Sequence, residues 1–468
     1  MSTLYITLIF IIFIELLSRV LEGKAIRETS ISSISQSDYR PPTYLQWLRV
    51  TTVIIILTTM SIASALDGAL ILMIGLILIF LLVRSFFVKM VIAAAKKTKV
   101  YRISEVLNSN EFKNSGFLLY FSAPDLREPT HVTMWSESLS SLQIPWFVLL
   151  REREHLSYFV ELKYPHVILI ENAADLNAIL PINANIIFYT NNGQKNRHMI
   201  NAEPNATHIQ LLHGDSDKPP SYSPLSKNYD YLFVAGQMAI DRYRNHGIEI
   251  PSEKFKIVGR PQVSGINTAI EPYRLRSIGY MPTWKGFYED TQLSSLDKAV
   301  DITKLVIENF ADASLLFKPH PMSFKDPSWK KIQRSVASQI SKNGRLAKSS
   351  ETPFDIYNES DILITDISSV MIDYLYSGKP IIVVLPEGFT NSDTWRYPSL
   401  AAAYLVDADL NNLVETINLA TSEDPMRAKR LDVRKEAFGD FPKPAGTAFR
   451  ETCLSLINKN YNRMPNDE

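Results

Sequence analysis

The sequence has 468 residues, enough for two α/β domains and an additional segment. Its 49 Lys and Arg residues balance its 49 Asp and Glu residues, so no overall basic charge points to a nucleic-acid partner. Cys453 is the only cysteine, which excludes an intrachain disulfide and a zinc site built on several cysteines. A single cysteine also fits a reducing compartment for the folded part.

Two apolar runs near the N-terminus predict a membrane anchor over residues 1–103. Leu4 to Val20 is interrupted by Glu15 and Arg19, and residues 50–83 are interrupted by one Asp-Gly turn signal. Because a spanning helix needs roughly 20 apolar residues, we expect spans at about 4–21, 50–66 and 69–83. A cleaved signal peptide is the alternative for the first run, but its start lacks Lys and Arg. One long helix or a re-entrant hairpin is the alternative for residues 50–83.

Basic residues flank both apolar runs and set the expected orientation. They are Lys24, Arg27, Arg40 and Arg49 between the runs, and Arg84, Lys89, Lys96, Lys97, Lys99 and Arg102 after the second. Positive-inside reasoning places both segments in the cytoplasm. We therefore expect a cell-membrane protein, multi-pass or anchored, with cytoplasmic catalytic domains. Residues 88–101 are either a basic interfacial helix or a juxtamembrane linker, and the sequence supports both equally.

From about residue 104, short apolar runs alternate with polar helical stretches, which predicts parallel sheets. The predicted strands are Phe117–Phe121, Pro145–Leu150, Val167–Ile170, Ile186–Tyr189, His208–Leu212, Tyr231–Val234, Lys256–Val258, Ile278–Met281, Leu315–Phe317, Ile362–Ile364 and Ile381–Leu385. These strands are too many for one open sheet, so we expect two Rossmann-like domains, at 104–260 and 261–468. A final amphipathic helix is predicted at Thr447–Leu456.

The first polar motif, His213-Gly214-Asp215-Ser216-Asp217-Lys218, follows a predicted strand. The ordinary pKa of His is near working pH, so His213 is a candidate general base. Gly214 permits close approach of a substrate to the backbone. Asp215 or Asp217 is a candidate to orient the imidazole, and Lys218 to hold an anion. A His that caps a turn beside a structural Gly explains the same residues without function.

Two further motifs also stand at strand ends. Pro282-Thr283-Trp284 offers Thr283 to a phosphate, although a plain turn explains it equally simply. Lys318-Pro319-His320-Pro321 places a His between two prolines, which hold the backbone extended. Lys318 and His320 are then candidate donors to a diphosphate. The alternative is a surface loop whose prolines end a strand.

The fourth motif, Thr365-Asp366-Ile367-Ser368-Ser369, runs from a predicted strand into a predicted helix. A helix N-terminus offers free N–H groups to a phosphate, and ligands of open α/β sheets lie at such strand ends. Asp366 suits an anion site only if it caps the helix or binds a hydroxyl, and Asp373 is a candidate contact to a ribose or to the acceptor. An ordinary capped helix is the alternative.

The order and spacing of these four motifs resemble the CDP-glycerol glycerophosphotransferases of teichoic acid synthesis. The resemblance covers about residues 115–455 and implies a GT-B-like pair of Rossmann-type domains, with parallel sheets, after the transmembrane region. It implies an N-terminal acceptor domain and a C-terminal nucleotide-donor domain. It makes His213 the candidate base, and His320, Ser368 and Ser369 the candidate contacts to the donor diphosphate.

This chain departs from that family where Asp215-Ser216 replaces Thr-Pro and where Ile367 replaces an aromatic residue. The family's better-known members also attach peripherally to the membrane, whereas this chain is predicted to span it. These differences bear on the identity of donor and acceptor rather than on the fold.

The expected function is transfer of glycerol phosphate, or another polyol phosphate, from a CDP-linked donor to a hydroxyl of a lipid-linked or cell-envelope polymer, with release of CMP. No cofactor is expected, and the lack of an obvious carboxylate cluster predicts metal independence. The enzymatic alternative is a GT-B glycosyltransferase that uses a nucleotide sugar. The non-catalytic alternative is a membrane-tethered scaffold that binds a polymer. The sequence does not determine the oligomeric state.

Overall fold

The computed structural model describes residues 116–124, 129–161, 166–179, 185–268, 274–286, 292–341, 343–348, 350–439 and 446–461. The predicted anchor of residues 1–103 and its three spans lie outside these residues. None of the helices that the structure describes is long and apolar enough to cross a membrane. The chain divides into two compact units. The first consists of Met1–Pro129, Pro145–Ala184 and His198–Pro204, and the second of Thr130–Ile144, Asn185–Arg197 and Asn205–Glu468.

The first unit contains a short parallel array of strands. Its described strands are β1 (Phe117–Phe121), β2 (Trp146–Leu150) and β3 (Val167–Leu169), paired in the order β3-β2-β1. Its helices are α6 (Leu156–Glu161) and α7 (Ala173–Ile179), and α8 (Asn196–Ala202) lies across the division between the units. All residues of β1 and β3 are apolar and buried, as is typical of parallel strands that are covered on both faces.

The second unit contains a second set of parallel strands that leads to the first motif. They are β4 (Ile186–Tyr189), β5 (Thr207–Gln210), β6 (Tyr231–Val234) and β7 (Phe255–Ile257), paired in that order. The helices of this region are α5 (Thr130–Ser140), α9 (Gln237–Asn245) and the final α16 (Thr447–Tyr461). Phe449 of α16 contacts the rings of Trp135 and Phe233, so the C-terminal helix packs against α5 and β6.

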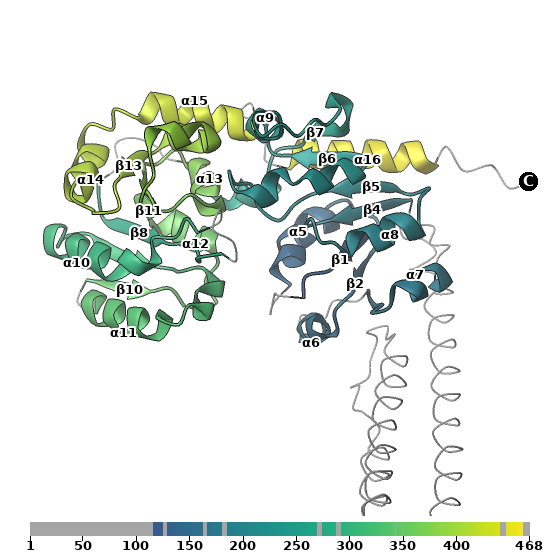
Figure 1. Ribbon diagram of the computed structural model, residues 1–468, viewed down its shortest axis with the longest axis horizontal. Coiled ribbons are helices and arrows are strands. Elements are labelled where there is room, and N and C mark those ends of the chain that lie inside the picture. The colour runs from purple at the N-terminus through teal and green to yellow at the C-terminus, as the bar shows by residue number, and fades with distance from the viewer. Residues whose placement is uncertain are drawn as a thin grey trace, which may run out of the picture. The chain divides into compact units, whose positions relative to one another are not determined.

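A six-stranded parallel sheet, in the order β10-β9-β8-β11-β12-β13, carries the other three motifs (Figure 1). Its strands are β8 (Ser277–Met281), β9 (Ser314–Phe317), β10 (Gly344–Leu346), β11 (Ile362–Thr365), β12 (Ile381–Val384) and β13 (Tyr404–Val406). Its helices are α10 (Ala299–Asn309), α11 (Trp329–Ile340), α12 (Pro353–Glu359), α13 (Ser369–Leu375), α14 (Leu413–Ser422) and α15 (Arg427–Phe438).

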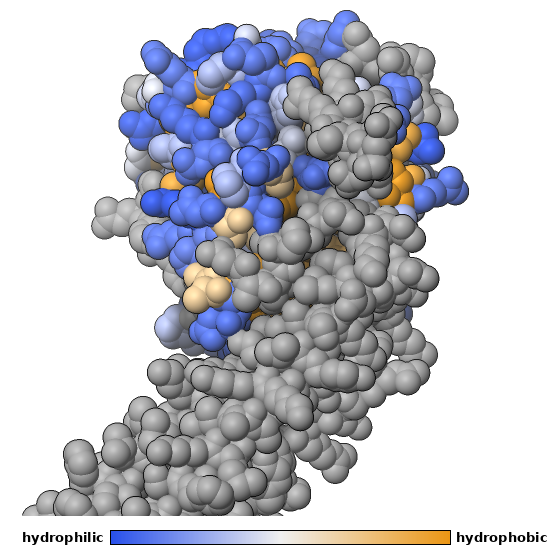
Figure 2. Space-filling view, turned by 90° about the vertical axis from the view of Figure 1, so that its right-hand side faces the viewer, coloured by the Kyte–Doolittle hydropathy of each residue, from blue (hydrophilic) through white to orange (hydrophobic). Residues whose placement is uncertain are grey.

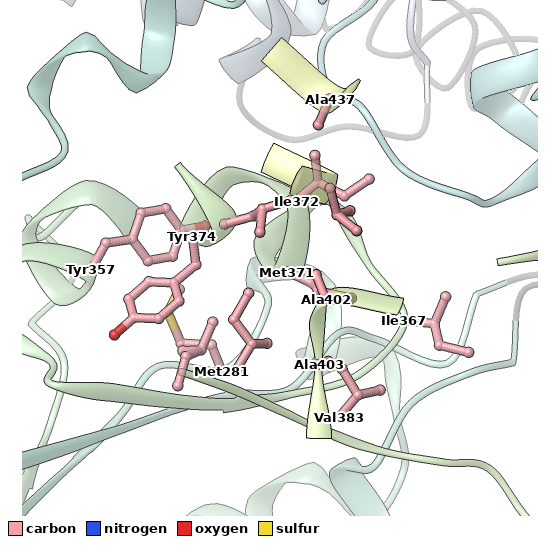
Figure 3. Packing of buried hydrophobic residues seen from close by; sticks show 14 of the residues in the cluster. Met281, Tyr357, Ile367, Met371, Ile372, Tyr374, Val383, Ala402, Ala403 and Ala437 are labelled. Carbon is pink, nitrogen blue, oxygen red and sulfur yellow. The ribbon is translucent and has the colours of Figure 1, made fainter. Parts of the chain in front are cut away.

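Successive residues of each strand in this sheet enter different cores, because side chains alternate across a strand. Leu363 packs in a cluster with α12, α13 and α15, whereas Ile362 and Ile364 pack in a cluster with α10, α11 and α14. Figure 3 shows Met371 and Ile372 of α13 within the first cluster. This packing fixes α13, and with it the two serines at its start.

Large apolar side chains are rarely exposed on the described surface. Those exposed are Ile257, Trp395 and Leu419. The described residues on the face seen in Figure 2 are mostly hydrophilic, with small separate orange patches. Burial is therefore concentrated in the sheets and their helices.

The predicted strands all agree with observed strands to within two residues at either end. Strands β10 and β13, of three residues each, were not predicted. The expected α/β fold with parallel sheets is confirmed. The domain boundaries 104–260 and 261–468 stay a prediction.

Candidate active site

All four motifs stand at the carboxyl ends of parallel strands in the second unit. His213 follows β5, Thr283 follows β8, His320 follows β9, and Asp366 follows β11. The groups lie close together: Nζ of Lys218 is 3.3 Å from Oγ1 of Thr283, and the pKa of His320, lowered mainly by burial, is lowered further by Lys218 and His213. The structure thus gathers residues that are far apart in the sequence.

His213 is held in the form that can accept a proton. Its Nδ1 lies 2.9 Å from the Thr190 carbonyl oxygen. A carbonyl can only accept, so Nδ1 donates its proton there and Nε2 keeps a free electron pair in the neutral ring. Burial, together with Arg260, lowers the pKa of His213 to about 4, so the neutral ring predominates at neutral pH. This is the tautomer and charge state that a general base needs.

The carboxylates expected to orient the imidazole are engaged elsewhere. Asp215 accepts a hydrogen bond from Nη1 of Arg242, and Asp217 accepts one from Nε of the same arginine at 2.5 Å. Asp217 also accepts hydrogen bonds from the backbone N–H and the hydroxyl of Ser399, at 2.9 and 2.5 Å. The Thr190 carbonyl therefore takes the orienting position predicted for Asp215 or Asp217. Both aspartates instead fix the loop through a fully buried arginine.

Asp373 is likewise occupied by an arginine. Its carboxylate accepts hydrogen bonds from Nε and Nη2 of Arg260, at 2.5 and 3.0 Å. Burial raises the pKa of Asp373, while Arg260 acts in the opposite direction. A buried carboxylate that accepts two hydrogen bonds from an arginine is poorly placed to reach a ribose or an acceptor. The structure therefore gives Asp373 a structural role as the partner of Arg260.

Gly214 brings the first motif into direct contact with the fourth. A Cβ added at Gly214 would lie 3.3 Å from Cβ and 3.6 Å from Oγ of Ser369. Such a separation is tighter than ordinary packing, so glycine permits the loop to approach the start of α13. The structure thus shows a close approach of Ser369 to Gly214, and the predicted approach of a substrate to this backbone stays a prediction.

Lys218 extends from the first motif to the second. Its Nζ lies 3.3 Å from Oγ1 of Thr283 and donates to it. Burial lowers the pKa of Lys218 to about 8, while the nearby Asp366 opposes that change. Lys218 is therefore mostly cationic at neutral pH and stands beside two of the other motifs. An anion bound there would gain a partly buried positive charge.

Asp366 accepts hydrogen bonds from a hydroxyl and from a backbone N–H. Binding a hydroxyl is one of the two roles, with capping of the helix, that make this carboxylate compatible with an anion site. Its carboxylate accepts hydrogen bonds from the Thr283 backbone N–H at 2.5 Å and from the Ser295 hydroxyl. Burial raises the pKa of Asp366 to about 7, although these bonds and Lys218 oppose the rise. Its negative charge near neutral pH is therefore partial, which weakens its repulsion of an anionic ligand.

His320 is held in the opposite tautomer to His213. Its Nδ1 accepts a hydrogen bond from the Met322 backbone N–H at 3.1 Å, so Nε2 carries the proton in the neutral ring. Burial is the main reason that the pKa of His320 is lowered to about 4. The backbone N–H of His320 donates to the Pro282 carbonyl, which links the second and third motifs. His320 thus presents a neutral N–H donor.

The other predicted residues have mainly structural contacts. Lys318 donates from Nζ to the Glu351 carbonyl at 2.7 Å, and burial lowers the pKa of Lys318. Thr365 donates from its hydroxyl to the Met281 carbonyl. Ser368 precedes α13 and donates from its hydroxyl to the Asp366 carbonyl at 3.3 Å. The structure thus ties Lys318 and Thr365 to backbone carbonyls of the fold.

Four supporting residues were missed in the sequence: Thr190, Arg242, Arg260 and Ser399. Arg242 lies in a polar amphipathic helix, where a charged residue is usually solvent-exposed, and the pairing of Arg260 with Asp373 spans 113 positions. Thr190 acts through its backbone, which leaves no signal in the residue type. A hydrophobic pattern could not have revealed any of them.

Three of the four motifs lie in a region that matches a known protein family. A family model described as CDP-Glycerol:Poly(glycerophosphate) glycerophosphotransferase matches residues 270–440. Over these residues the chain is similar to the CDP-glycerol glycerophosphotransferase family. The match includes the second, third and fourth motifs, and it confirms both the resemblance and the enzyme class expected from them. His213 to Lys218 precede the matched region.

Solved structures show a similar fold. The wall teichoic acid polymerase TagF has 13% sequence identity and a TM-score of 0.51, covering 79% of this chain and 94% of that chain. A protein from Listeria monocytogenes, described as a UDP-N-acetylglucosamine 2-epimerase, has 12% identity and a TM-score of 0.50, covering 76% and 99%. At these identities the likeness shows a GT-B-like fold alone. No curated protein matches the chain significantly.

Proposed function

We propose that this glycerophosphate transferase moves glycerol phosphate, or another polyol phosphate, from a CDP-activated donor to a hydroxyl of a lipid-linked or cell-envelope polymer, and releases CMP. The observation that carries the proposal is the opposite tautomers of His213 and His320. One ring offers a base and the other an N–H donor. A base that takes the proton of the hydroxyl and a donor that stabilises the leaving phosphate both assist transfer of a phosphoryl group to a hydroxyl.

In the proposed reaction, Nε2 of His213 accepts the proton of the acceptor hydroxyl. The hydroxyl oxygen forms a bond to the phosphorus that bears the polyol, and the bond from that phosphorus to the bridging oxygen of CMP breaks. The electron pair leaves with CMP. Such displacements depend on positioning and on stabilisation of charge. The chain therefore needs donors and cations more than a nucleophile of its own.

His320 and Lys218 would stabilise the leaving phosphate. Nε2–H of His320 is available as a donor, and Lys218 is mostly cationic below the pKa of about 8 that burial gives it. Thr283, Ser368 and Ser369 are the other proposed donor contacts. Asp366 would hold Thr283 in place through its backbone N–H.

Metal independence is part of the proposal. Among the described residues, no group of three or more His, Cys, Asp or Glu side chains is placed to hold a metal ion. Lys218 is a proposed source of positive charge at the site.

Attachment to the membrane, with the catalytic residues on the cytoplasmic side, is also proposed. The apolar runs at 4–20 and 50–83 and the basic residues that flank them support this part. An anchor would keep the site near a lipid-linked acceptor. Fractionation of cells expressing the full chain tests it, and recovery of all the protein in the soluble fraction would contradict it.

The reaction is tested by offering the purified full chain CDP-glycerol, CDP-ribitol or UDP-N-acetylglucosamine with a lipid-linked acceptor. The proposal expects release of CMP and a product heavier by the polyol phosphate. Release of UDP or CDP with transfer of a sugar would instead show a glycosyltransferase. Binding without turnover would show a scaffold. Thermal unfolding with each nucleotide identifies the bound donor independently, because a ligand of the native state raises the melting temperature.

A further inference from the structure

Helix α5 supplies two side chains that contact the segment around His213. The ring of His131 stacks on the ring of His213, with centroids 3.5 Å apart and planes inclined by 6°. One turn further along the helix, Nε1–H of Trp135 donates to the Leu212 carbonyl at 2.7 Å. Residues at this spacing lie on the same face of a helix. One face of α5 therefore contacts both Leu212 and His213.

The backbone just before the base adopts a conformation that needs such support. Leu212 has φ of 56°, in the left-handed region that costs a non-glycine residue of order 1–3 kcal/mol. Its N–H donates to Oε1 of Gln210 at 2.9 Å, and its carbonyl accepts from Trp135. The Gln210 amide in turn donates to the Asn191 carbonyl at 2.8 Å. Strain of this kind persists only where surrounding contacts hold the backbone in place. Here the conformation of Leu212 sets the direction in which the side chain of His213 points.

The imidazole of His213 is thus held in two different ways. The Thr190 carbonyl holds its Nδ1 edge, which sets the rotation of the ring in its plane. The His131 ring covers one face, which sets the plane itself. Together these contacts leave Nε2 with one direction. Arg260 acts on the charge of His213, and His213 in turn acts on that of His320.

We propose that His131 is a positioning residue for His213: its ring stacks on the face of the base, and with Trp135 it keeps Nε2 directed at the acceptor hydroxyl. This inference rests on the proposed role of His213. It adds a second requirement. When His213 takes the acceptor's proton, His131 must stay neutral, because two cations in stacked contact repel.

The test compares His131→Ala, His131→Phe and Trp135→Phe in the full chain. His131→Ala should lower kcat by roughly 10- to 100-fold, since a small misplacement of a catalytic group can cost about that much. The KM for the donor should stay within about twofold, because only the base is misplaced. His131→Phe keeps a flat ring on His213 and should restore most of the rate. Trp135→Phe removes only the N–H donor and should give a smaller loss.

His246→Ala is the matched control. His246 also stacks on an aromatic ring, that of Tyr222, at a centroid distance of 3.7 Å. It has no part in the proposed catalytic or donor site, so its loss should leave kcat near that of the wild type. An equal loss of rate in His246→Ala and His131→Ala would overturn the proposal.

A titration of the His213 ring by NMR adds a readout that does not depend on turnover. Loss of His131 exposes one face of His213 to water, so the pKa of His213 should rise from about 4 towards its ordinary value of 6.5. His131→Phe should keep it low. An unchanged titration in His131→Ala, or no rescue of rate by His131→Phe, would overturn the proposal.

His213→Ala, measured in parallel, separates the role of His213 as the base from the role of His131 in positioning it. If it still turns over, the base assignment fails and this inference fails with it. If it is inactive while His131→Ala has the wild-type rate, the inference alone fails. Should His131→Ala not fold, His131→Phe and Trp135→Phe still decide the question through their rates and titrations.

Discussion

The loops that carry His213 and His320 make the most instructive comparison within the second unit. Both histidines follow a parallel strand, and both have a pKa lowered to about 4, mainly by burial. Yet a backbone carbonyl accepts from Nδ1 of His213, whereas a backbone N–H donates to Nδ1 of His320. One peptide group thus determines whether the same side chain presents a base or a donor.

The two loops also differ in what holds them. The His320 loop depends on its own prolines and on a turn that begins at Pro321. The His213 loop depends on distant residues, because Asp217 binds both Arg242 and Ser399. Short-range turns and a backbone bond to the Pro282 carbonyl therefore hold the His320 loop, whereas side chains from distant elements hold the His213 loop. The variants below test this contrast.

Exchange of each histidine for alanine should separate their roles and give the largest effect. His213→Ala should lower kcat by about 10²- to 10⁴-fold, the usual contribution of a general base, and leave the donor KM nearly unchanged. His320→Ala should raise the donor KM as well, because it removes a proposed contact to the diphosphate. Steady-state kinetics of CMP release measure both. The same change of kcat and KM in the two variants would remove the contrast.

Loss of the buried Arg242 should remove the contacts that hold the His213 loop and should lower the free energy of unfolding. Arg242→Ala leaves Asp215 and Asp217 as uncompensated buried charges, which costs about 3–5 kcal/mol. Arg244→Ala on the same helix is the control, because the ion pair of Arg244 with Asp241 is exposed and worth about 0–1 kcal/mol. Urea unfolding followed by tryptophan fluorescence compares them. Equal midpoints would show that the buried pairs contribute nothing.

An added methyl group at Gly214 should disturb the contact between the first motif and the start of α13. Gly214→Ala forces Ser369 to move and should cost about 1–3 kcal/mol, as overpacking usually does. Gly265→Ala is the control, since an added Cβ there meets nothing within 4 Å. Thermal unfolding of the two variants decides. If Gly214→Ala matched the control, the close packing against Ser369 would be refuted.

The dependence of kcat/KM on pH should give the smallest effect and the finest test. His213 accepts a proton only when neutral, so activity should fall as the pH falls through about 4. Lys218 binds an anion only as a cation, so activity should fall as the pH rises through about 8. Lys218→Arg should move the alkaline limb to higher pH, because arginine stays charged. An unmoved limb would assign it to another group.

The sequence predicted what depends on short-range patterns. Apolar runs located the strands, and polar residues at their ends located His213, Thr283 and His320. The buried pairs were beyond its reach, because Arg260 and Asp373 are separated by 113 positions and either charge alone is typical of a surface. His131 was missed for the same reason, since a single histidine on a helix indicates nothing until its neighbour is known.

The bond between Asp217 and Ser399 also has a consequence during synthesis of the protein. The two residues are 182 positions apart, so these bonds of the His213 loop cannot form until residue 399 has left the ribosome. At about 5–20 residues per second, that interval is roughly 10–35 s. Throughout it, a nascent chain carries its histidine on an unfinished loop. Enzymatic competence therefore arrives late in translation.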